Sequence, residues 1–92
     1  MIVHNVAEVS RTVEVTVTQA DSTSPNIDTR FDLPPHSKRK INNEVLMDSD
    51  YDVEVSFTDE TRDSAYSETQ AWDDAGKALH VMLNNQIVFT VQ

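Results

Sequence analysis

The chain has 92 residues, with 16 Asp or Glu against 7 Lys or Arg, a formal net charge of −9, no cysteine and a single glycine. The length suits one domain, residues 1–92, and the charge argues against a nucleic-acid partner, because phosphate binding needs a basic face. The lack of cysteine excludes a disulfide framework, a thiolate metal site and a blue-copper centre, and no apolar run is long enough for a membrane-spanning helix.

Most of the chain alternates apolar and polar residues, which is the period of a β-strand. In Arg11–Gln19, for example, valines alternate with threonine and glutamate, and β-branched residues of this kind favour strands. Pro34 and Pro35 end one such segment, because proline cannot donate to a strand ladder. In chain order the expected strands are Ile2–Asn5, Arg11–Gln19, Ile27–Leu33, Ser37–Leu46, Asp50–Thr58, Ser64–Trp72, Ala78–Leu83 and Gln86–Val91.

Short alternating strands with turn signals about every 8–12 residues indicate an all-β fold, a two-sheet antiparallel sandwich of immunoglobulin-like type with seven to eight strands. The acidic residues fall at the outward alternate positions and in the turns. Carboxylates hold hydration water in concentrated salt, and the salt screens their mutual repulsion. The composition therefore predicts a halophilic source.

The last two strands allow two hairpin registers. A two-residue turn would pair Leu83 with Gln86 and leave apolar residues on both faces. A three-residue loop would pair Leu83 with Ile87 and gather the aliphatic and aromatic residues on one face. Burial favours the second register, because a slip of one residue moves every side chain to the other face. In either case Met82 and Val88 remain apolar on the second face.

Two features are candidate contact points. Lys38, Arg39 and Lys40 are three consecutive cations of the seven in the chain, and they suit an acidic neighbour, including another copy of this chain. Alternatively, they belong to a solvated edge strand whose lysines discourage edge-to-edge pairing. Met82 and Val88 are a candidate subunit contact, or else scattered surface hydrophobes. These five residues form the expected protein interface.

Catalytic and metal chemistry find little support in the sequence. The aspartates of residues 48–52 have the opening spacing of a calcium loop, but Val53 occupies the position of its required glycine. His4, His36 and His80 lie on three separate segments, and a zinc site would need all three to converge. No serine elbow or glycine-rich phosphate loop is present. We therefore expect no catalytic residue, no cofactor and no metal ligand, and so no enzyme.

Several segments resemble a known group of domains. They are Asn5, Arg11-Thr-Val-Glu-Val-Thr-Val, Phe31-Asp-Leu-Pro-Pro and Asp50-Tyr-Asp-Val-Glu-Val. These segments are similar to the small immunoglobulin-like β-sandwich domains common in haloarchaeal proteins, and the resemblance runs from residue 2 to about residue 58. It rests on strand and turn patterns, and it implies a non-catalytic module. Members of that group are typically exported, whereas the start of this chain lacks the pattern of a signal peptide.

The sequence thus predicts a non-catalytic structural or adaptor subunit of a larger protein assembly from a halophile. The most specific form of this prediction is a virion component, such as a capsid decoration, a turret or a tail-attached protein. The alternatives are a cell-envelope or appendage interaction module and a soluble module that binds a sugar, a metal or a peptide. The expected partners are other protein subunits, with no nucleic acid and no membrane insertion, and the expected location is the virion or the cytoplasm.

Overall fold

The computed structural model describes residues 1–19, 22–41, 50–59, 64–72 and 79–91, and this part of the chain forms eight strands and no helix. They are β1 (Ile2–Asn5), β2 (Arg11–Gln19), β3 (Ile27–Leu33), β4 (Ser37–Lys40), β5 (Tyr51–Thr58), β6 (Tyr66–Trp72), β7 (Leu79–Leu83) and β8 (Ile87–Val91). The first three have the expected bounds, and β5, β6 and β8 begin one or two residues later than expected. Residues 42–46 of the expected fourth strand, and residue 78, lie outside the described residues.

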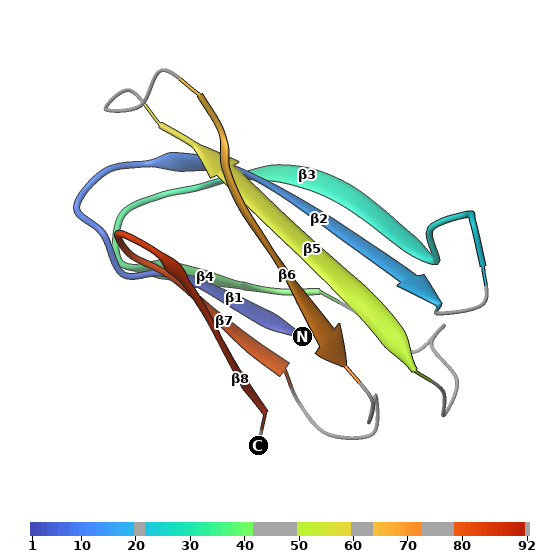
Figure 1. Ribbon diagram of the computed structural model, residues 1–92. Helices are drawn as coiled ribbons and strands as arrows, with labels where there is room; N and C mark the ends of the chain where they lie inside the picture. The colour runs from blue at the N-terminus through green and yellow to red at the C-terminus, as the bar shows by residue number, and fades with distance from the viewer. Residues whose placement is uncertain (20–21, 42–49, 60–63, 73–78, 92) are drawn as a thin grey trace.

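The strands form two four-stranded sheets that pack face to face (Figure 1). Sheet A has the strand order β4-β1-β7-β8, and sheet B has the order β3-β2-β5-β6. The all-β two-sheet sandwich is therefore confirmed. Every pair is antiparallel except β1 with β7, which is parallel. These two strands are far apart in the chain, so no tight turn forces them to run in opposite directions.

The core lies between the sheets and is built from the inward alternate positions of the strands. Its largest fully buried side chain is Trp72 at the end of β6, which is 1% exposed. The core consists of Met1, Val3, Val13, Val15, Val17, Phe31, Leu33, Ile41, Tyr51, Val53, Val55, Phe57, Trp72, Leu79, Val81, Leu83 and Ile87. Each large apolar side chain buried in this way contributes about 1.5–3 kcal/mol.

The β7–β8 hairpin has the three-residue loop 84–86, and Leu83 pairs with Ile87. The register chosen on burial is therefore confirmed. It places Leu83 and Ile87 in the core, while Met82 and Val88 pair with each other on the outer side of sheet A. Val88 is 52% exposed, and Met82 is partly buried.

Candidate surface for protein contacts

The outward residues of sheet A form one continuous surface, which we name the lysine face. Residues paired across neighbouring strands share a face of the sheet, so the registers of sheet A align them in two rows. One row is Lys40, Ile2, His80 and Thr90, and the other is Lys38, His4, Met82 and Val88. The four residues at the row ends are exposed, and the four central ones are partly buried. Neither row contains a carboxylate.

The outer side of sheet B has the opposite character, and we name it the acidic face. Its described residues are Thr12, Glu14, Thr16, Thr18, Asp28, Arg30, Asp32, Asp52, Glu54, Ser56, Thr58, Ser67, Thr69 and Ala71. Arg30 is the one cation in this set, against the carboxylates of two glutamates and three aspartates. The two outer faces therefore differ in charge, with two lysines and no carboxylate on that of sheet A and a net negative charge on that of sheet B.

The structure divides the expected interface residues between two sides of sheet A. Lys38, Lys40, Met82 and Val88 lie on the lysine face, with the lysines on β4 at one edge and Val88 on β8 at the other. Arg39 points to the inner side of β4, and its guanidinium carbon lies 4.8 Å from the ring centre of Phe31. This cation–π contact closes the side of the sandwich between β4 and β3. Arg39 is thus placed away from the lysine face.

Two histidines meet at the centre of the lysine face. Nε2 of His4 on β1 and Nδ1 of His80 on β7 are 3.1 Å apart, and the two rings are stacked with centres 5.4 Å apart. A hydrogen bond between two ring nitrogens needs one donor and one acceptor, so the pair cannot hold it with both rings protonated. Burial lowers the pKa of His4, and the charges of His80 and Lys38 lower it further.

We expect the free energy of unfolding to decrease as the pH falls through about 6.5, the ordinary pKa of histidine. In the unfolded chain His4 takes up a proton near that pH, whereas folded His4 stays neutral to lower pH, so the unfolded state gains protons first. Urea unfolding between pH 8 and pH 5.5 measures the slope. His4→Gln should reduce this slope more than the control variant His36→Asn does. Asparagine suits the control because it tolerates the positive φ of 56° at position 36. Equal slopes in the two variants would contradict the assignment.

A shallow depression lies at the β4 end of the lysine face. Its lining residues are His4, Asn5, Val6, His36, Ser37 and Lys38. His36 and His4 both line it, yet the described residues contain no group of three or more His, Cys, Asp or Glu placed to hold a metal ion. Of the calcium-like aspartates, Asp48 lies outside the described residues, and Asp52 belongs to the acidic face.

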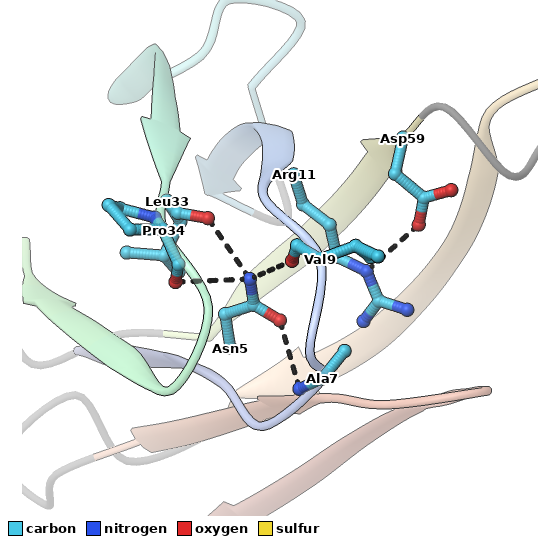
Figure 2. A network of polar contacts seen from close by, with 7 residues as sticks. All are labelled: Asn5, Ala7, Val9, Arg11, Leu33, Pro34 and Asp59. Carbon is cyan, nitrogen blue, oxygen red and sulfur yellow. Dashed lines mark hydrogen bonds and ion pairs between the residues drawn. The ribbon is translucent and has the colours of Figure 1, made fainter.

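Asn5 holds together the loops at one end of the lysine face (Figure 2). Its side chain is 1% exposed, and its amide nitrogen donates to the carbonyl oxygens of Val9 at 2.8 Å, Leu33 at 3.0 Å and Pro34 at 3.2 Å. Its side-chain oxygen accepts from the backbone N–H of Ala7 at 3.2 Å. One side chain therefore ties the β1–β2 loop to the turn that leads into β4, the strand that carries the lysines.

Arg11 forms a buried ion pair beside this network (Figure 2). Its Nε donates to Oδ2 of Asp59 at 3.1 Å, and its guanidinium carbon lies 4.1 Å from the ring centre of Phe57. The side chain of Arg11 is 5% exposed and that of Asp59 is fully buried. Among the described residues, Nη1 of Arg11 has no hydrogen-bond partner. The pair closes this end of sheet B and depends on the one carboxylate.

Sequence reasoning missed the histidine pair, the Asn5 network and the Arg11–Asp59 pair. A signal existed for two of them, because Arg11 and Asn5 occupy inward alternate positions of their strands, where a polar residue needs a buried partner. The histidine pair had no such signal, since it depends on β1 lying next to β7.

No helix in the described part of the chain is long and apolar enough to cross a membrane. Comparison with protein-family models, curated proteins and solved structures finds no match to this chain.

Proposed function

We propose that the protein is a non-catalytic structural or adaptor subunit that joins a larger assembly through its lysine face. The observation that carries this proposal is the absence of carboxylates from both rows of that face, in a chain with 16 of them. The lysine face carries two charged side chains against six on the acidic face, so it costs less than the acidic face to dehydrate against a partner. Exposed Val88 beside partly buried Met82 adds apolar area to the contact.

The partner that suits this face is a protein with an acidic surface. Lys38 and Lys40 are exposed on the edge strand β4, and the row partners beside them are Ile2 and His4 on β1. Complementary charge across an interface mainly sets specificity and the rate of encounter, while apolar contacts supply much of the affinity. We therefore assign partner selection to the lysines and the main buried area to the centre and the β8 side of the face.

The setting included in this proposal is a halophile, and within it a virion in which the protein decorates a capsid, a turret or a tail. The acidic composition supports the halophilic source, because a −9 charge on 10.4 kDa is tolerated best where salt screens it. A small sandwich with one face that can lose its water suits a shell in which many copies make the same contact. Co-sedimentation of the protein with purified particles tests the virion setting, and its absence from such particles would favour a cell-envelope module.

Charge reversal tests the contact face directly. We expect Lys38→Glu with Lys40→Glu to lose the partner that wild-type protein retains when it is purified from its source at the lowest salt concentration in which it stays folded. The control is Glu14→Lys with Glu54→Lys, which changes two exposed charges on the acidic face and should keep the partner. Both pairs are exposed, so neither should disturb folding. An unchanged set of bound proteins after reversal of the lysines would contradict the proposal.

A further inference from the structure

Four of the eight described strands lie at the edges of their sheets, and they differ in how those edges are protected. β4 and β8 border sheet A, whereas β3 and β6 border sheet B. Such edges present unpaired backbone groups, and charged side chains on them discourage pairing with another chain. The charged residues are Asp28, Arg30 and Asp32 on β3, Lys38, Arg39 and Lys40 on β4, and Glu68 on β6. β8, with the sequence Ile-Val-Phe-Thr-Val, contains none.

The contrast is sharpest between β6 and β8, which contact each other on one side of the sandwich. On β6, Glu68 lies on the inward side with buried Trp72, yet it is exposed and accepts a hydrogen bond from the Tyr66 hydroxyl at 2.8 Å. An inward-pointing charge of this kind blocks strand addition, because pairing would bury it. β8 lies on the margin of its sheet (Figure 1), and its sequence contains no charged residue.

The exposure of β8 follows the same pattern. Its residue Val88, 52% exposed, is one of two large hydrophobic residues in the described part of the chain that are exposed, the other being Val6 in a loop. Thr90 is also exposed, while Ile87 is buried and Phe89 is partly buried against the core. β8 thus presents an uncharged edge. Its inner side packs on the core through Ile87 and Phe89, and its outer side exposes Val88 and Thr90.

We propose that β8 pairs in antiparallel fashion with β8 of a second copy, so that the two sheets A become one continuous sheet. A two-fold axis at Phe89 is the register that pairs all five residues of the strand. It sets Phe89 opposite its own copy and Val88 opposite Thr90 of the second copy. Aromatic and β-branched pairs across strands are the favourable combinations in such a ladder.

The second copy is favoured because β8 is complementary to itself: antiparallel pairing with its own copy sets uncharged residues opposite each other at every position, whereas each of the other three edge strands contains charged residues. Each chain carries −9, and β8 is the edge at which two copies can meet without opposing charged strand residues. The net charges of the two copies repel each other, and salt screens that repulsion while it strengthens apolar burial. Pairing through β8 should therefore tighten as salt rises. A contact made by the lysine face with an acidic partner should instead weaken, so the two surfaces respond in opposite directions.

Sedimentation equilibrium over a range of protein concentrations, at low and at molar salt, tests the pairing. We expect Val88→Lys with Thr90→Lys to weaken the dimer by roughly tenfold or more, because lysines then oppose lysines across the axis. Val88→Lys with Thr90→Glu should restore it, since each introduced lysine then faces an introduced glutamate. Ser67→Lys with Thr69→Lys on β6 is the matched control, with the same charge change at two exposed edge positions, and should leave the dimer intact.

The register has its own test, because the chain contains no cysteine. Val88→Cys and Thr90→Cys proteins are mixed and oxidised, and the mixed disulfide should form in preference to either disulfide between identical variants. The proposal would be overturned if disulfides formed preferentially between identical variants. It would also be overturned if the lysines of the β6 control weakened the dimer as much as the β8 lysines do.

A wild-type protein that stays monomeric at all concentrations in molar salt would also overturn the β8 pairing. The proposed function would remain open to its own test, because reversal of the β4 lysines does not involve β8. Conversely, the β8 dimer could form while reversal of Lys38 and Lys40 leaves the set of bound proteins unchanged. That result would support the β8 pairing and contradict the function proposed for the lysine face.

Discussion

Asp59→Asn is expected to lower the free energy of unfolding by about 3–5 kcal/mol, the range typical of a buried ion pair that loses one partner. The guanidinium of Arg11 is almost fully buried and lies over the ring of Phe57, so it cannot turn to water without opening this end of the core. Small domains are stable by only about 5–15 kcal/mol, so the variant should lose a large fraction of its stability.

The same geometry predicts that a second substitution restores stability. Arg11→Met in the Asp59→Asn background removes the uncompensated charge and places an apolar chain against Phe57. Replacement of a whole buried ion pair by apolar residues is often neutral or stabilising. The double variant should therefore be more stable than Asp59→Asn alone, even though it differs from wild type at two buried positions.

Urea is the suitable denaturant, because it leaves the salt concentration constant, and all variants are compared in the same salt. Asp52→Asn is the matched control, since it removes an exposed carboxylate from the acidic face and should change stability by less than about 0.5 kcal/mol. A cost for Asp59→Asn as small as that of the control would show that the guanidinium of Arg11 reaches solvent.

The comparison of expected and observed strands shows what alternation of residue types determines. In β2 and β5 the alternate valines and aromatic residues are buried and the residues between them are partly or fully exposed, so the pattern predicted both the strand and its inward side. The β7–β8 register was predictable for the same reason, because only one loop length gathers the apolar residues on one face.

Alternation does not determine which strands become neighbours. The contact between His4 and His80 spans 76 positions, and it exists because β1 and β7 pair in parallel, which no turn signal could indicate. The three consecutive cations, Lys38, Arg39 and Lys40, lie on two different sides of β4 for another reason. Lys38 and Lys40 face outward and Arg39 inward because β4 is a strand, yet three consecutive charges show no alternation from which to predict this.

Asn5→Asp is expected to cost more than Asn5→Ala, although aspartate has nearly the same shape as asparagine. The alanine variant leaves buried carbonyl groups without their donor and should lose about 2–3 kcal/mol. The aspartate variant adds a carboxylate that faces the carbonyl oxygens of Val9, Leu33 and Pro34, which accept hydrogen bonds and cannot donate them. An isosteric change should therefore be the more damaging one, by at least about 1 kcal/mol.

The pH dependence separates this repulsion from a loss of packing. Burial among acceptors raises the folded pKa of the introduced carboxyl above the unfolded value of about 3.9, so the folded state binds the proton more tightly. The deficit of Asn5→Asp relative to wild type should consequently shrink as the pH falls from 7 toward about 4, since a protonated carboxyl can donate one of the lost hydrogen bonds. Asn5→Ala carries no titrating group, so its deficit should stay constant in the same urea experiments. If the deficits of the two variants changed with pH in parallel, the amide of Asn5 would not be the donor that joins the β1–β2 loop to the turn before β4. The position of β4, and with it the lysine face, would then depend on the backbone pairing of β1 with β4 alone.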